Sequence, residues 1–350
     1  MEQVKDTQIS EHPLSACTVS VSPHVKSRES TAKIMWTVNA CLLPPLLLSV
    51  FIFGFQTLII TLVSVLSCVI AEAVSQKLLH RPITLKDGSA VVTGLLLAYI
   101  IPPGVPYWMP ILGAVFTIYI TKHLFGGLGF NIFNPALIGR AFLVATFPVA
   151  MTSAWIMPMN DFSIFKYMQP GIDAVSTATP LYVLKHYGLA ALIDKYGAVS
   201  TMYKDFFLGV RPGCIGEVSN LLLLLGGLVL IFKKYISWHI PVSVIATIGV
   251  LTWIFGGEGY FNGDPILAVL TGGVFLGAIF MATDYVTSPT QKNAQLAFGF
   301  GVGAITVLIR LKGGYPEGVC YAILLMNTLT PALDSWFQPK RFAPAKGAIK

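Results

Sequence analysis

The polar stretch Asp173-Ala-Val-Ser-Thr-Ala-Thr-Pro-Leu181 contains the residues best suited to covalent chemistry. Pro180 biases the preceding Thr179 toward an extended backbone, and an extended threonine can present its hydroxyl group as a nucleophile. The residues just before Thr179 are small, so a bulky group could approach the backbone closely, and Asp173 stands six positions upstream. The alternative is an ordinary polar turn capped by a serine or threonine.

The composition indicates that most of the chain lies in a membrane. The chain has 350 residues, of which 55% are hydrophobic and 11% are charged, and its mean hydropathy is +0.72. A soluble protein carries roughly 25% charged residues. The net charge of +7 does not indicate nucleic-acid binding, because the basic residues stand at the ends of apolar runs, where membrane topology explains them.

The apolar runs predict an all-α polytopic membrane protein with about ten transmembrane helices. An odd number of spans in each half would make a five-plus-five repeat inverted, as in many transporters. The sequence around Thr93-Gly94 resembles that around Thr271-Gly272, and each pair follows an aspartate, which supports such a repeat. The predicted spans are 34–54, 57–76, 88–101, 108–121, 136–157, 219–232, 239–256, 265–283, 295–309 and 317–333.

The same runs divide the chain into five regions. These are an amino-terminal arm (1–33), a first membrane half (34–157), a polar loop with Thr179 (158–218), a second membrane half (219–334) and a tail (335–350). If both termini are cytoplasmic, 15 of the 23 lysines and arginines lie inside. The positive-inside rule therefore predicts cytoplasmic termini and an extracytoplasmic Thr179.

The sequence lacks the usual signals of other redox and nucleotide sites. Its five cysteines include no CxxC pair, so an iron–sulfur cluster or zinc site made by this chain alone is not expected, and we predict no metal. The glycine run Gly299–Gly303 lies inside an apolar span, where close helix packing explains it better than nucleotide binding.

Several stretches together resemble one family of membrane proteins. They are the Thr179 stretch, Ser22–Val25, Asp87–Gly94, Phe133–Ala141, Met281–Asp284 and the basic tail, so the resemblance covers about residues 20–345. The family comprises the D subunits of Rnf-type electron-transport complexes and the B subunits of sodium-pumping NADH:quinone reductases. The compact length makes the chain more similar to the Rnf branch.

This resemblance implies a flavoprotein. A flavin transferase would recognise Asp173, Ser176 and Thr177 and attach FMN to Thr179 through a phosphoester bond, and a second, noncovalent flavin would also be compatible. The chain would act only within a complex, in a prokaryotic inner membrane, whose other subunits carry iron–sulfur clusters and flavins. That complex would couple electron transfer between ferredoxin and NAD to translocation of Na⁺ or H⁺. The alternatives are a quinone-reducing B subunit and a non-redox channel or transporter.

Two charged residues fall inside predicted spans, where charges are costly and commonly functional. Arg140 could contact a flavin or belong to an ion path, or it could extend to the cytoplasmic interface. Glu72 could pair with Arg140, stand at an ion entrance or lie at the interface.

Overall fold

A computed structural model describes residues 29–158, 178–257, 259–315 and 317–338 of the chain. These residues form helices and no strand, and several helices are long runs of apolar residues. The prediction of an all-α polytopic membrane protein is therefore confirmed. Asp173, Ser176 and Thr177 lie outside the described residues.

The first half of the chain contains two long helices followed by shorter ones. The helix α1 begins after Ser30, whose side chain accepts a hydrogen bond from the Lys33 amide, and Gly54 separates it from α2 with a φ of +89°. The bounds are α1 Thr31–Phe53, α2 Phe55–Leu78, η2 Leu85–Asp87, α3 Ser89–Tyr99, α4 Trp108–Val115, η3 Phe116–His123, α5 Pro135–Thr146 and α6 Pro148–Ser153. The segment η3 continues α4 as a π-helix, a form common at functional sites.

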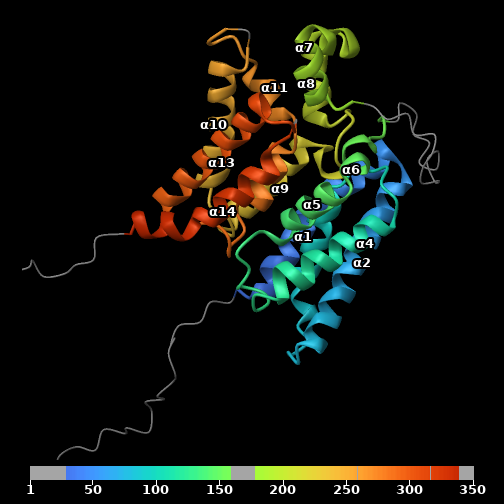
Figure 1. Ribbon diagram of the computed structural model, residues 1–350, viewed down its shortest axis with the longest axis vertical. Coiled ribbons are helices and arrows are strands. Elements are labelled where there is room, and N and C mark those ends of the chain that lie inside the picture. Colours follow the sequence, from blue (N-terminus) through green and yellow to red (C-terminus); the bar gives the residue numbers. More distant parts are fainter. Residues whose placement is uncertain (1–28, 159–177, 258, 316, 339–350) are drawn as a thin grey trace, which may run out of the picture.

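The predicted polar loop contains helices of its own. They are α7 Pro180–Tyr196, α8 Val199–Leu208 and η4 Ile215–Glu217, and Figure 1 shows α7 and α8 projecting from one end of the molecule. The hydroxyl group of Tyr203 in α8 donates a hydrogen bond to Asp264, the residue before α11. Burial, followed by this bond, raises the pKa of Tyr203 to about 12, so the hydroxyl group keeps its proton at neutral pH.

The second half begins with two helices and then a broken one. The bounds are α9 Asn220–Phe232, α10 His239–Phe255, α11 Pro265–Leu270, α12 Val274–Leu276, η5 Gly277–Met281, α13 Lys292–Lys312 and α14 Val319–Trp336. In Figure 1 these yellow-to-red helices lie beside the blue-to-green helices of the first half.

Two predicted spans are interrupted. The span predicted at 136–157 breaks between α5 and α6, because Pro148 lacks the amide hydrogen that would continue α5. The span predicted at 265–283 breaks at Thr271–Gly273, where both glycines have positive φ. By length and composition, three described helices (α1, α2 and α13) could each cross a membrane, so the number of spans stays a prediction.

The two halves pack in the same order, as a repeat would require. The helix α2 packs against α3 and α4, and α10 packs in the same way against α11 and α13. The helices that follow, α5 and α14, pack against η3 and α13, while α1 packs against α9 across the two halves. This order supports the predicted five-plus-five repeat.

Candidate functional site

Thr179 is the residue that caps the amino terminus of α7. Its backbone is extended (φ −63°, ψ 153°), as expected for a residue before proline, and Pro180 occupies the first turn. The Thr179 hydroxyl oxygen accepts a hydrogen bond of 3.3 Å from the Tyr182 amide. The residue is 7% exposed. The helix therefore directs its unpaired amide groups and its positive dipole end toward the Thr179 side chain.

The first turn of α7 rests on the break between α11 and α12. A Cβ atom added to Gly272 would lie 2.5 Å from Leu181 Cδ1 and 2.6 Å from Arg310 Nη2. The Lys185 ammonium group donates a hydrogen bond to the Gly313 carbonyl, just beyond α13. These contacts hold the start of α7 against the second half of the chain.

We expect Gly272→Ala to be much more harmful than Gly129→Ala. Both glycines have positive φ, but a Cβ at Gly129 would meet open space. Positive φ alone costs an alanine about 1–2 kcal/mol, and the contacts with Leu181 and Arg310 add an overpacking cost of about 1–3 kcal/mol. The thermal midpoints of the two detergent-solubilised variants test this, and equal midpoints would contradict the packing of α7 on this turn.

Two buried arginines bind the carbonyl groups where α11 ends. Arg310 donates hydrogen bonds of 2.6 and 3.0 Å to the carbonyls of Ala268 and Thr271. Arg211 donates to the carbonyl of Leu270 and, at 3.1 Å, to that of Glu217. Positive charge is favourable at the carboxyl end of a helix, so both arginines stabilise the interrupted span.

Arg140 pairs with Glu317, which lies in the segment between α13 and α14. Their side chains are 15% and 14% exposed, so the prediction that Arg140 extends to the interface is wrong. The pair connects α5 of the first half with the start of α14 in the second, and Glu317 was not singled out from the sequence. Its position at the end of an apolar run gave the same signal as an interfacial carboxylate.

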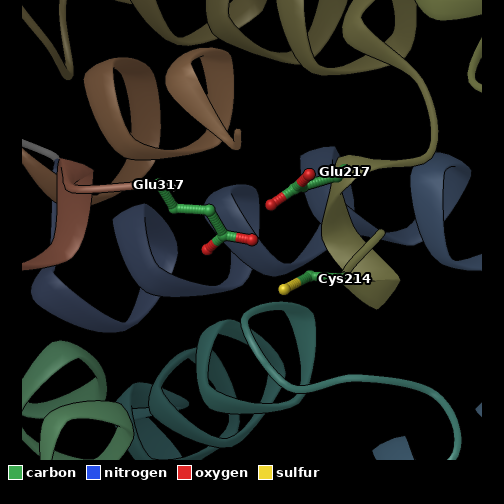
Figure 2. Close-up of side chains that lie close together, drawn as sticks. All are labelled: Cys214, Glu217 and Glu317. Carbon is green, nitrogen blue, oxygen red and sulfur yellow. The ribbon is translucent and has the colours of Figure 1, made fainter. Parts of the chain in front are cut away.

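A second carboxylate, Glu217, faces this pair. One ligand atom each from Cys214, Glu217 and Glu317 lies within 4.8 Å of the others, and Figure 2 shows the three side chains converging. Such a group could hold a metal ion, but it offers only three ligands. Arg140 and Arg211 already supply positive charge to the carboxylates, so the geometry favours an ion-pair cluster over a metal centre.

A separate buried ion pair joins α2 to the π-helix η3. The Lys122 ammonium group donates hydrogen bonds of 2.8 and 2.7 Å to the Glu72 carboxylate and one of 2.7 Å to Ser89 Oγ. Glu72 Oε1 also lies 3.7 Å from His123 Nε2. The prediction that Glu72 pairs with Arg140 or lies at the interface is therefore wrong, because its side chain is 1% exposed and bound to Lys122.

The largest cavity among the described residues lies next to this pair. Its volume is about 740 Å³, and its lining includes Ser89 and Lys122 together with residues of α1, α9 and η5. Thr179 and Arg140 are not among its lining residues, so the cavity and the start of α7 are distinct sites.

The fold and these sites define a class: an all-α polytopic membrane protein with buried ion pairs between two similarly packed halves and a capped threonine on a projecting helix. Residues 18–343 match the model of the NQR2, RnfD, RnfE family, and the chain belongs to that family.

Characterised relatives are similar along nearly the whole chain, and each of the three described here is named as the D component of its complex. The chain is 50% identical over 326 residues to that of the proton-translocating ferredoxin:NAD(+) oxidoreductase complex of Clostridium ljungdahlii, covering 93% of this chain and 96% of the relative. It is 44% identical over 331 residues to that of the Na(+)-translocating ferredoxin:NAD(+) oxidoreductase complex of Acetobacterium woodii, covering 94% and 96%. It is 37% identical over 355 residues to that of the ion-translocating oxidoreductase complex of Erwinia tasmaniensis, covering 94% and 99%.

Proposed function

We propose that the chain is the flavin-carrying D subunit of an Rnf-type complex, which couples electron transfer between ferredoxin and NAD to ion translocation. The observation that carries this proposal is the match to proteins of that name over more than nine-tenths of the chain. The relatives are named for different ions, so Na⁺ and H⁺ both stay open for this chain.

The start of α7 suits a phosphoester-linked FMN at Thr179. A helix amino terminus attracts phosphate through its unpaired amides and its dipole, and Thr179 Oγ1 already faces the Tyr182 amide. The phosphate oxygens would accept hydrogen bonds from the amides that the free hydroxyl group caps. Asp173, Ser176 and Thr177 would form the sequence that the flavin transferase recognises. When bound, FMN supplies one- and two-electron redox chemistry.

The large cavity suits the second, noncovalent flavin. Its volume of about 740 Å³ lies within the range of small-molecule sites. Its walls are mainly apolar, which suits a planar ring system, and Ser89, Lys122 and Asn131 supply hydrogen-bonding groups along one side. A flavin released by denaturation, in addition to the covalent one, would support this assignment.

Other subunits must supply and remove electrons. Four cysteines are described, Cys41, Cys68, Cys214 and Cys320, and all are free thiols. This arrangement supports a chain that relies on iron–sulfur and flavin subunits, the latter including the nicotinamide site. Co-purification of such subunits is expected, and an isolated chain that reduces NAD from ferredoxin would contradict it.

We expect the α7–α8 end to be extracytoplasmic and both termini to be cytoplasmic. A cysteine at Ser200, exposed on α8, should react with a membrane-impermeant thiol reagent on intact cells, whereas one at Ser335, exposed near the end of α14, should not. Cys17 and Cys41 are changed to serine in both variants to remove background labelling. The opposite labelling pattern would place Thr179 in the cytoplasm.

The decisive test of the proposed function is the denatured wild-type chain. A covalent flavin survives denaturation, so the chain should fluoresce as one band under ultraviolet light when the host contains a flavin transferase. A dark band in that host would favour the non-redox channel or transporter. Activity with NADH and a quinone, but without ferredoxin, would instead favour the quinone-reductase alternative.

A further inference from the structure

Glu217 is a buried carboxylate with a long ion pair. It ends η4, and its side chain is 8% exposed. Its distance to Arg211 Nη2 is 4.0 Å, and the Arg211 guanidinium also donates to the carbonyls of Leu270 and Glu217. A buried charge requires close compensation. The carboxylate of Glu217 is therefore held less firmly in its ionised form than that of Glu317, which Arg140 contacts closely.

A small cavity connects Glu217 with the Arg140–Glu317 pair. Its volume is about 20 Å³, and Glu217, Glu317 and Arg140 all line it. A site of this size with several polar walls can hold one water molecule. Such a water would accept or donate hydrogen bonds between the two carboxyl groups, which point toward each other in Figure 2.

Only one turn of backbone separates Glu217 from the start of α7. A Cβ atom on Gly273 would lie 3.2 Å from Glu217 Oε1, and one on the neighbouring Gly272 would lie 2.5 Å from Leu181 Cδ1. Leu181 is two residues after Thr179. A change of charge at Thr179 would therefore act on Glu217 across a thin, buried layer where electrostatic interactions are strong.

The surroundings of Glu217 favour a proton over a metal cation. Arg211 precedes it, Arg140 faces it from α5, Arg310 faces it from α13 and Glu317 faces it from the segment before α14. With both carboxylates ionised, these three cations and two anions leave one positive charge in excess. A metal cation would increase that excess, whereas a proton binds directly to the carboxylate oxygen.

We propose that Glu217 is a redox-linked proton-binding group, which takes up one proton when an electron is added to the flavin on Thr179. This inference rests on the proposed function. The electron comes from a one-electron donor in a neighbouring subunit, and the proton comes from solvent through the small cavity. An O–H bond forms on Glu217 upon reduction and breaks when the electron leaves, so each added negative charge is balanced by one proton.

Redox-difference infrared spectroscopy of the purified complex tests this directly. Reduction should produce the carbonyl stretching band of a protonated carboxyl group, which a carboxylate lacks. Glu217→Gln should lose this band, and Glu217→Asp should retain it at a shifted frequency. Asp194→Asn, which changes an exposed carboxylate on α7, is the matched control and should leave the band unchanged.

The midpoint potential of the covalent flavin provides a second readout. Proton uptake makes the potential fall as pH rises, so the fall should be shallower in Glu217→Gln than in the wild type or Glu217→Asp. A fluorescent, flavin-loaded Glu217→Gln chain with unchanged band and pH dependence would overturn this inference alone. A wild-type chain without covalent flavin would instead remove both this inference and the proposed function.

Discussion

Thr179→Ala is expected to abolish the fluorescent band of the denatured chain completely. The substitution removes the oxygen that would form the phosphoester bond, and no other described hydroxyl group caps α7 in its place. Thr179→Ser keeps a nucleophilic oxygen at the same helix end, so we expect it to retain fluorescence. The measurement is in-gel ultraviolet fluorescence of chains expressed together with a flavin transferase, normalised to protein.

The control for this experiment is Thr177→Ala. It changes a second threonine of the same motif and leaves the Thr179 hydroxyl group intact, so the band should remain largely unchanged. If Thr177→Ala were dark and Thr179→Ala still fluoresced, the attachment site would be two residues earlier. Loss of helix capping in Thr179→Ala costs about 1 kcal/mol, which is too little to explain a complete loss of fluorescence by unfolding.

Local features of the site could be predicted from the sequence. The extended backbone of Thr179 follows from the steric demand of Pro180, and the helix after it begins where a proline is best tolerated. The spans also followed from apolar runs, because hydrophobic length is a strong signal in membrane helices. The helices of the predicted polar loop were missed, since their sequences carry no long apolar run.

The charge cluster could not be predicted, because its partners are distant in the sequence. Arg140 and Glu317 are separated by 177 positions, and only the packing of α5 near the start of α14 brings them together. Arg310 stands at the end of an apolar run and therefore resembled an interfacial residue. Its partners are carbonyl groups exposed by the break at Thr271, and backbone carbonyls carry no residue-type signal.

The break in the eighth predicted span is what joins these features. An uninterrupted helix would satisfy the carbonyls of Ala268, Leu270 and Thr271 internally and leave Arg211 and Arg310 without partners. Because Gly272 and Gly273 adopt positive φ there, the chain turns, the arginines bind the carbonyls, and the turn supports both Leu181 and Glu217. Non-helical backbone at membrane depth is tolerated where protein encloses it, and such breaks commonly form transport sites.

Lys122→Met is expected to destabilise the chain strongly. The substitution preserves side-chain length but leaves Glu72, at 1% exposure, as a buried carboxylate without its ammonium partner. Breaking one side of a buried ion pair costs about 3–5 kcal/mol. The double variant Lys122→Met/Glu72→Leu removes both charges and should recover most of that loss, because apolar replacements of a whole buried pair are often neutral or stabilising.

The thermal midpoint of the detergent-solubilised chain measures both effects. Lys77→Met is the matched control, because Lys77 is exposed at the end of α2 and an exposed lysine contributes little to stability. We expect the midpoints of wild type, Lys77→Met and the double variant to lie close together, with Lys122→Met well below them. If the double variant were as unstable as Lys122→Met, the loss would come from packing around η3, and the Glu72–Lys122 pair would not be the interaction that fixes η3 against α2.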